Sequence, residues 1–554
     1  MSRLFLILVA AVAIAWATQQ SGRVIPDSEY GGSRGPIQLN GPADNIENLP
    51  SDSRLYDDID LLKTSGLIRT MPSTSRPWTR GECARLVDEA LGKSRTVRLA
   101  PGQRAALKRL EFEFGWELHR SVARRSSINI PVPDTPGDTA RCNLFSRLAA
   151  TRDRQGLSGA VVLDNRPSDK FCFYERGELT FYHPNIPGES LSYDSAGVHL
   201  PGKRVLPWRN IATFDAELAY LAIKLPWVRL ELGRDDFVWG PGYTGSVMLN
   251  NTAPALDHVQ LCASYRNFKF LSLNSFLSRW GTTPRFLSAQ RVEVSLLNHV
   301  TLGGAMMVVS SWDSLQPTQL GGLINPLIPV YLSESNSADW ANLLMGCDAV
   351  AYLPRTKVYG QLFLDNYEFN TLKLAPDAYG AQAGAYWAPN LPVEARIEYT
   401  RITAFTYYHR VHSIMYENYL TPLGHSLGPD ADQLCATFNV VPNGWLKILI
   451  GGDYTRRGYH NRGDYLRKSY KDPQDTLYLR QHDEFPTRGW DTLADTVTEE
   501  VDKTIRFSPG IEVQALRDLF VSLTVGLWHS QNYQGAIGLK KDGVDLALKV
   551  EYRY

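Results

Sequence analysis

The chain has 554 residues, of which 44% are hydrophobic, 11% aromatic and 21% charged. This length favours several domains or one large barrel, and the composition excludes a disordered, collagen-like or disulfide-dense chain. Lys plus Arg (58) equals Asp plus Glu (58), so the chain has no overall basic field to attract nucleic acid. No apolar run after the N-terminus reaches about 18 residues, which excludes a polytopic helical membrane protein but not a β-barrel.

The N-terminus is typical of a secretory signal peptide. Arg3 precedes an apolar stretch, residues 4–17, that ends in the small-x-small pattern Ala15-Trp16-Ala17. Because this stretch is short for a membrane span, we expect cleavage near Ala17 rather than anchoring. The Gly- and Pro-rich residues 18–47 have no apolar period and predict a flexible leader.

The six cysteines are scattered, with neither a CxxC pair nor a His at ligand spacing. In an oxidising compartment one disulfide could form, but the spacing predicts neither a disulfide framework nor a metal site. They are Cys83, Cys142, Cys172, Cys262, Cys347 and Cys435.

A compact helical bundle is predicted over residues 48–125. A first helix begins near Leu55 and stops at Gly66, and a capping box, Thr79-Arg80-Gly81-Glu82, opens a second. A third begins at Pro101, and its apolar residues recur at spacings of three and four: Leu107, Leu110, Phe114 and Leu118.

From residue 126 to residue 554 the hydrophobic period changes to two, as expected of β-strands. At the C-terminus apolar residues alternate with mostly charged ones: Val544, Leu546, Leu548, Val550, Tyr552 and Tyr554 against Asp545, Ala547, Lys549, Glu551 and Arg553. The same alternation recurs over 228–233, 291–296 and 393–400. The joint at Asn298-His299 predicts a tight turn between two strands.

Three observations favour a membrane barrel over a soluble β-sandwich. The chain ends on Tyr554 in an amphipathic strand, as outer-membrane barrels do when their closing strand carries the signal read by the barrel-assembly machinery. Its 27 Tyr and 13 Trp often lie near the ends of alternating runs, as in interfacial girdles. Residues 126–554 can hold about 16–18 spanning strands of about 9–11 residues each, with around a dozen residues left for each connection. Lumen-facing acids, Glu231, Glu394 and Glu398, are expected to pair with Arg229, Arg396 and Arg553 in a solvated interior.

Motifs of enzymes and cofactor sites are absent: there is no GxGxxG, Walker loop, HExxH or GxSxG. Asp235 and Asp236 are adjacent and would point to opposite faces of a strand, unlike a facing catalytic pair. A hydrolase built on Ser246 with His258 or His299 has no support in the spacing. We therefore predict no catalytic residues, no cofactor and no metal.

Two motifs carry a family resemblance. The first runs from Gly233-Arg234 into Trp239-Gly240-Pro241-Gly242 and on to Leu249-Asn250-Asn251 and Ala253-Pro254. The second is Pro422-Leu423-Gly424-His425 followed by Gly428-Pro429-Asp430. With the two motifs in this order, the chain resembles the capsule-assembly outer-membrane proteins of the Wzi family. The resemblance covers nearly the whole mature chain.

The resemblance implies an all-β transmembrane barrel of about 18 antiparallel strands with an N-terminal helical bundle on the periplasmic side. It also implies lectin-like attachment of capsular polysaccharide or exopolysaccharide to the cell surface, without catalysis. The implied partners are surface polysaccharide, outer-membrane lipid and lipopolysaccharide. The motif positions carried over are Arg234, Trp239, Gly240, Pro241, Gly242, Asn251, Pro254, Gly424, His425 and Gly428.

Independently of the resemblance, two polar aromatic clusters suit a sugar, because saccharides bind to aromatic faces and planar polar side chains. One lies within 454–503 and the other between 407 and 419. The glycan-binding candidates are Tyr454, Arg456, Arg457, Tyr459, Tyr465, Arg467, Trp490, Tyr408, Arg410 and His412. The alternatives are a channel for sugars or other small solutes and a secreted soluble polysaccharide-active enzyme.

Overall fold

The structure of the chain is a computed structural model. The described residues are 45–119, 128–131, 139–150, 154–164, 170–184, 193–194, 197–200, 203–208, 212–296, 298–312, 324–326, 328–330, 332, 341–366, 378–404, 406–409, 412–419, 421–458, 501–516, 519–533 and 538–553. The predicted signal peptide, residues 1–17, and residues 18–44 of the predicted leader lie outside these ranges.

Among the described residues, four helices precede the barrel: α2 (Leu55–Thr64), α3 (Arg80–Ser94), α4 (Pro101–Glu113) and α5 (Gly115–His119). The predicted capping box is confirmed, because the Glu82 amide donates to Thr79 Oγ1 (3.2 Å) and the Thr79 amide donates to Glu82 Oε2 (2.8 Å). The third predicted helix is divided at Phe114, where the helix-weakening Gly115 begins α5. Apolar residues of all four helices form one core.

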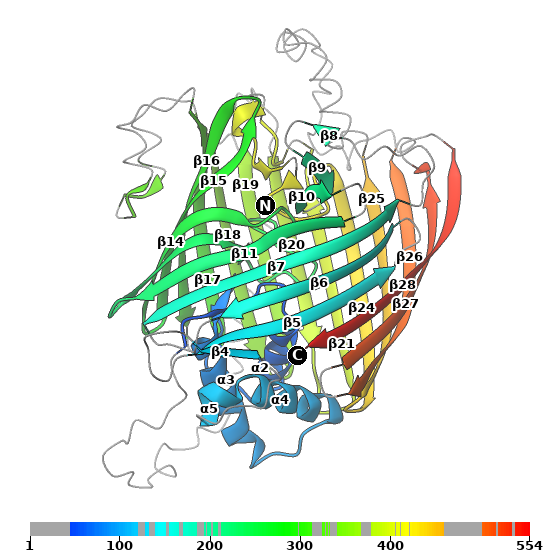
Figure 1. Cartoon of the computed structure of the whole chain (residues 1–554). Helices are drawn as coiled ribbons and strands as arrows, with labels where there is room; N and C mark the ends of the chain where they lie inside the picture. Colours follow the sequence, from blue (N-terminus) through cyan, green and yellow to red (C-terminus); the bar gives the residue numbers. More distant parts are fainter. Residues whose placement is uncertain are drawn as a thin grey trace. The chain divides into compact units, whose positions relative to one another are not determined.

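The remaining chain is an antiparallel barrel, shown in Figure 1. Its strands are β5 (Thr139–Ala150), β6 (Arg154–Asp164), β7 (Phe171–Pro184), β11 (Ala212–Lys224), β12 (Val228–Asp235), β14 (Leu256–Tyr265), β15 (Phe268–Trp280), β16 (Thr283–Leu296), β17 (Val300–Ser311), β18 (Asn342–Leu353), β19 (Thr356–Asn366), β20 (Ala378–Trp387), β21 (Val393–Ile402), β24 (Ala431–Asn443), β25 (Leu446–Arg457), β26 (Asp502–Leu516), β27 (Leu519–Gln531) and β28 (Lys540–Arg553). In the described part of the chain each strand pairs with the next, β7 pairs with β11, and β28 pairs with β5. These pairings make a closed ring of 18 strands, as predicted.

Shorter strands flank this ring: β4 (Ile128–Pro131) extends it beside β5, and β8 (Tyr193–Asp194), β9 (Gly197–Leu200) and β10 (Lys203–Trp208) pair in series beside β11. Four other short strands matter for the interior, namely β1 (Asn48–Leu49), β2 (Ser75–Arg76), β3 (Trp78–Thr79) and β13 (Val238–Trp239). β22 (Glu417–Asn418) and β23 (Thr421–Pro422) form a small hairpin.

The burial pattern of the barrel is the inverse of that of a soluble sheet. On β14, Val259 is 43% exposed whereas its neighbours His258 and Gln260 are 4% and 5% exposed. On β12, Leu232 is 54% exposed and Glu231 is fully buried. On these two strands apolar residues therefore face outward and polar residues face the interior, as a lipid-facing barrel requires. Among the described residues, no helix has the length and apolar character needed to cross a membrane.

The two ends of the barrel differ in their connections. At one end the strands are joined by two to six residues, at 165–170, 225–227, 266–267, 297–299, 354–355, 388–392, 444–445 and 517–518; the other end carries long connections such as 236–255, 403–430 and 458–501. The predicted tight turn is confirmed, since Asn298 has a φ of 57° and the His299 amide donates to Leu296 O. The helices, blue in Figure 1, contact the short-turn end: Lys63 Nζ donates to Asn298 O (3.3 Å) and Asn390 Nδ2 donates to Arg98 O (2.9 Å).

The end of the predicted leader is well packed. Asn45, Ile46 and Glu47 are buried, and Asn45 Nδ2 donates to Glu117 Oε1 at 3.0 Å. The packed chain therefore begins before residue 48, the predicted start of the helical bundle. This segment is held by its hydrogen bonds, which apolar periodicity does not reveal.

The predicted lumen pairing is correct for one arginine and wrong for another. Arg229 Nη1 lies 2.6 Å from Glu231 Oε2. Arg396, expected to meet Glu394 or Glu398, instead reaches Asp57 Oδ1 (3.3 Å) of α2. It does so because the helices extend their acids toward the lumen, a contact between elements distant in sequence. The side chain of Arg553 lies outside the described set. Five cysteines carry free thiols: Cys83, Cys172, Cys262, Cys347 and Cys435.

Candidate functional site

The barrel encloses an apolar core, rather than the solvated lumen that the sequence predicted. Inward-facing strand residues such as Leu273, Met307 and Phe363 pack against residues of the two long connections 236–255 and 403–430. From these connections come Phe237, Trp239, Val247, Met248, Leu249, Ala253, Tyr407, Ile414, Tyr416, Leu423 and Leu427. Both family motifs thus fold into the barrel instead of extending from it.

The Trp-Gly-Pro-Gly segment is attached to the N-terminal region by backbone pairing. β13, which holds Trp239, pairs with β2, and the Gly240 amide donates to Thr74 O at 2.9 Å. Gly240 has a φ of 137°, and a Cβ there would come within 2.2 Å of Gln361 Oε1. Glycine is therefore favoured here by the backbone conformation, and a Cβ would in addition displace the Gln361 side chain of β19.

The two motifs meet at Thr244. Its Oγ1 contacts Glu398 Oε1 and lies 2.9 Å from His425 Nε2. Glu398 Oε2 also accepts hydrogen bonds from the Tyr243 amide (2.7 Å) and the Tyr359 hydroxyl (2.6 Å). One carboxylate on β21 thus anchors the first motif to the barrel wall, and Thr244 links it to the second.

The hydrogen bonds of His425 fix its tautomer. Because Thr244 Oγ1 donates to Glu398, His425 Nε2 must carry the hydrogen that it shares with Thr244, and Nδ1 accepts from the Leu427 amide at 3.1 Å. Burial lowers the pKa of His425 to about 4, and a second ring proton would face the Leu427 N–H group. This histidine is a neutral structural residue at neutral pH.

Tyr407 forms another link between the second motif and the first. Its hydroxyl donates to Val247 O (2.8 Å) and accepts from the His425 amide (3.2 Å). A Cβ on Gly424 would lie 2.4 Å from the Tyr407 ring, so the second motif also needs a glycine for close packing.

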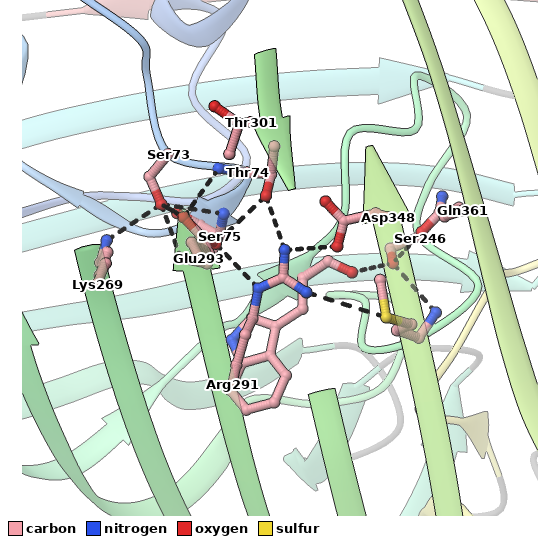
Figure 2. Close-up of polar contacts among 12 residues, drawn as sticks. Ser73, Thr74, Ser75, Ser246, Lys269, Arg291, Glu293, Thr301, Asp348 and Gln361 are labelled. Atoms are coloured by element: carbon pink, nitrogen blue, oxygen red, sulfur yellow. Dashed lines mark hydrogen bonds and ion pairs between the residues drawn. The ribbon is translucent and has the colours of Figure 1, made fainter. Parts of the chain in front are cut away.

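A buried ionic network lies beside these motifs (Figure 2). Arg291 Nε donates to Glu293 Oε1 (2.9 Å), and its Nη2 lies 2.6 Å from Asp348 Oδ2 and 2.7 Å from Thr74 Oγ1. Ser73 Oγ donates to Glu293 Oε2 at 2.6 Å. One buried cation is shared by two carboxylates and by the N-terminal segment, which fixes that segment in the barrel.

The sequence does not predict Asp348 and Thr74 as partners of Arg291, because they lie far from it along the chain. Arg291 and Glu293 lie on a run that the alternation identified, but Asp348 and Thr74 come from other parts of the chain. Nothing in the spacing brings these residues together, and the side-chain period gives only the face on which each lies.

A second network holds the first short strand. Asn48 Nδ2 donates to Glu231 Oε2 (2.8 Å) and to Asp235 Oδ2 (2.7 Å), and His258 Nε2 lies 3.0 Å from Glu231 Oε1. Asn251, a motif residue, donates to Ser51 Oγ at 3.0 Å. As in the Arg291 network, the polar groups of this second network form hydrogen bonds with one another.

The remaining motif residues also have structural contacts. Arg234 forms a two-pronged ion pair with Asp257 (2.7 and 2.9 Å) on the barrel wall. Pro254 O accepts from Asn418 Nδ2 at 3.3 Å. A Cβ on Gly242 would lie 2.0 Å from Gly245 O, whereas Gly428 has a φ of 72°. Pro241 lies within the same turn.

The arrangement offers no nucleophile–base pair at the residues that the sequence singled out. Ser246 Oγ contacts Trp239 O and lies 3.0 Å from Gln361 Oε1, and within the described ranges no histidine is among its hydrogen-bond partners. In the same ranges, no group of three or more His, Cys, Asp or Glu side chains could hold a metal ion.

The glycan candidates whose side chains the structure describes, Tyr454, Arg456, Arg457 and Tyr408, do not lie together in one site. Tyr454 is 36% exposed and shares the outward face of β25 with Arg456, which pairs with Asp432. Arg457 has the opposite orientation along the strand, and its Nη1 donates to Leu427 O at 3.0 Å. Tyr408 is buried. Tyr459, Tyr465, Arg467, Trp490, Arg410 and the side chain of His412 lie outside the described residues.

Comparison with known proteins agrees with this architecture. The family model described as capsule assembly protein Wzi matches residues 166–538. The chain is similar to Wzi of Escherichia coli, described as an outer membrane protein involved in group 1 capsule assembly and as a carbohydrate-binding β-barrel. The two share 14% identity at a TM-score of 0.57, over 92% of this chain and 99% of that one.

Two proteins of Pseudomonas aeruginosa are more distant. OccK5 (OpdH) gives a TM-score of 0.41 and 9% identity over 75% of this chain and 97% of that one, and OccD3 (OpdP) gives 0.40 and 9% over 76% and 92%. No curated protein sequence matches the chain. The family match covers more than half of the sequence, and the chain belongs to the Wzi capsule-assembly family.

Proposed function

We propose that the protein attaches capsular polysaccharide or exopolysaccharide to the cell surface as a non-catalytic, lectin-like barrel of the outer membrane. The observation that carries this proposal is the packed interior, where two long connections and the N-terminal segment fill the barrel around Trp239 and Tyr407. A lumen occupied by an apolar core suits a holding function better than the passage of solutes.

Family membership supports the same proposal. The similar E. coli barrel is described as binding carbohydrate and as taking part in capsule assembly. The outward apolar surface of the strands supports residence in a membrane. The signal peptide would direct export and be cleaved near Ala17, and the barrel-assembly machinery would then insert the mature chain. Lipid and lipopolysaccharide are then the partners of the outer wall.

Non-catalytic binding is supported by the contacts of those side chains whose chemistry could serve catalysis. Ser246, His425 and Glu398 are each bonded within the motif junction, where they hold segments together. Glycan contacts are proposed instead for the connection between β25 and β26, which carries Tyr459, Tyr465, Arg467 and Trp490, a set able to stack on sugar rings and attract acidic groups.

The test is deletion of residues 459–490, which leaves β25 intact because that strand ends at Arg457. Cell-bound and released polysaccharide are measured in a strain that makes only the deleted protein. We expect unchanged membrane insertion, seen as a folded detergent-extracted barrel, together with polysaccharide released into the medium.

A matched control shortens the connection between β19 and β20, residues 367–377, and should leave retention unchanged. Full retention after the 459–490 deletion would remove that connection from the proposal. Recovery of the intact protein in the soluble periplasm without detergent would instead favour a soluble enzyme.

A further inference from the structure

A cavity of about 180 Å³ lies between the helices and the inner face of β21 and of β24 to β27. It is several times larger than the roughly 30 Å³ that one water molecule occupies in the liquid. Residues of α2, of α4 and of the short turn 444–445 line it, so it lies at the end of the barrel that the helices contact. Tyr243, which directly follows the Trp-Gly-Pro-Gly segment, lines the same cavity.

Tyr243 presents an aromatic ring to this cavity. The ring packs on the guanidinium of Arg396, whose Cζ lies 4.4 Å from the ring centroid, and the ring of Tyr386 packs on the same guanidinium at 4.0 Å. Arg396 in turn pairs with Asp57 of α2 at 3.3 Å. Tyr243 is nevertheless 42% exposed, although its connection folds into the barrel. The cation therefore holds one side of the ring, and the rest of the ring is open to the cavity.

The cavity also holds a buried amide without a partner. Asn439 is 8% exposed, and among the described residues its side chain has no hydrogen-bond partner. The hydroxyl groups of Tyr243 and Ser522 line the cavity as well, and they form no hydrogen bond within the described ranges either. Buried amides in folded proteins are nearly always hydrogen-bonded, so Asn439 indicates a place for a ligand that can both donate and accept hydrogen bonds.

The charged groups of the cavity compensate one another. Among the described residues four cations and four acids line it, and each cation has an acid within 3.3 Å. The pairs are Arg54–Glu512, Arg109–Asp58, Arg396–Asp57 and Lys447–Glu394. Asp60, which lies 3.7 Å from Arg396, pairs with Lys357 at 3.1 Å. A charged ligand would have to break one of these pairs or remain uncompensated, whereas a neutral ligand leaves them intact.

We propose that this cavity binds a neutral pyranose unit of the attached polysaccharide. The apolar face of the pyranose would stack on the Tyr243 ring, and its hydroxyl groups would bond to Asn439 and Ser522. The choice of the polysaccharide as the source of this unit rests on the proposed function, whereas the preference for a neutral sugar rests on the cavity alone. The barrel then contacts the polysaccharide at a second place, on the side of the helices.

The test is titration of the purified full-length protein by calorimetry and by saturation-transfer NMR. The detergent must have no sugar headgroup, because such a headgroup would compete for the site. The neutral probes are cellobiose, lactose and mannobiose, and the acidic probe is digalacturonic acid. We expect saturable binding of a neutral disaccharide that changes little with added salt, and at least about tenfold weaker binding of digalacturonic acid.

Substitutions at two positions locate the site. Tyr243→Leu removes the ring and should weaken binding at least about fivefold, whereas Tyr243→Phe keeps the ring and should retain most of the affinity. Asn439→Leu replaces the amide by an apolar group of similar size and should weaken binding to a similar extent. Because Asn439 lies outside the family motifs, this variant tests the site even where Tyr243→Leu disturbs the motif.

The matched control is Tyr265→Leu. Tyr265 is 65% exposed at the end of β14, and its ring also carries a cation, with Arg266 Cζ 5.3 Å from the centroid. It is not among the described residues that line the cavity, so this variant should bind the neutral disaccharide as the unaltered protein does.

Failure of all the neutral disaccharides to bind, or equally tight binding of digalacturonic acid, would overturn the assignment of a neutral saccharide. Unaltered affinity in both Tyr243→Leu and Asn439→Leu would overturn the location. Absence of binding in vitro with normal polysaccharide retention in cells would reject this site but not the attachment function. Saturable binding by a protein whose removal from cells releases no polysaccharide would instead keep the site and reject the attachment function.

Discussion

Thr244 and His425, 181 residues apart in sequence, share a hydrogen bond of 2.9 Å inside the barrel. The bond joins the two family motifs, and through Glu398 it joins both to the barrel wall. Because each partner is held in turn by Leu427 or Glu398, the junction fixes two long connections in one arrangement. The interior of the barrel is thereby a folded core with its own tertiary contacts.

Removal of the imidazole should weaken this junction measurably. His425→Ala leaves a cavity and two unpaired groups, so we expect a loss of about 2–4 kcal/mol in the free energy of unfolding. Denaturant unfolding in detergent, followed by tryptophan fluorescence, measures it. In a double-mutant cycle with Thr244→Val, additive losses would argue against coupling between the two motifs.

The protonation of His425 predicts a pH dependence of stability. The folded pKa of about 4 lies below the ordinary value of 6.5, so between these values the unfolded chain binds a proton that the folded chain does not. The contribution is complete above about pH 6.5 and falls by about 3 kcal/mol as the pH decreases toward 4. The difference in unfolding free energy between the unaltered protein and His425→Gln should narrow over this window; a constant difference from pH 7 to 4 would contradict the assignment.

The ionic network around Arg291 predicts that removal of this one charge strongly lowers the free energy of unfolding. Arg291→Met leaves Glu293 and Asp348 without their shared cation, and we expect a loss of about 3–5 kcal/mol. Replacement of Asp348 by Asn in the same chain should recover part of it. Arg506→Met is the matched control, since Arg506 pairs with Asp545 at 3.5 Å and both side chains are about two-fifths exposed; its cost should stay below about 1 kcal/mol. Equal losses in the two variants would count against a structural role of the network.

Gly424 should not tolerate a methyl group. Its Cβ would overlap the Tyr407 ring at 2.4 Å, and overpacking of this kind costs about 1–3 kcal/mol. Gly92, in the last turn of α3, has open space around it, so Gly92→Ala should stabilise the protein by up to about 1 kcal/mol. Unfolding midpoints compare the two, and a neutral Gly424→Ala would show that the packing against Tyr407 is looser than described.

The sequence predicts those features that depend on neighbours in the chain. The capping box of Thr79 and Glu82, the turn at Asn298 and the outward apolar face of strands such as β12 and β14 follow from short spacings and side-chain periods. The meeting of Thr244 with His425 and the partners of Arg291 depend on which connections turn inward. The period of two gives the face of a strand but not the long-range contact, so a solvated lumen was expected where a packed core exists.

Conductance in planar lipid bilayers tests the central claim most directly. If the two motif connections fill the barrel, the purified full-length protein should insert and show little steady current, and added sugars should not alter it. A stable open-channel current that oligosaccharides block in a concentration-dependent manner would contradict the closed interior, and would favour a solute channel over a polysaccharide-attachment protein.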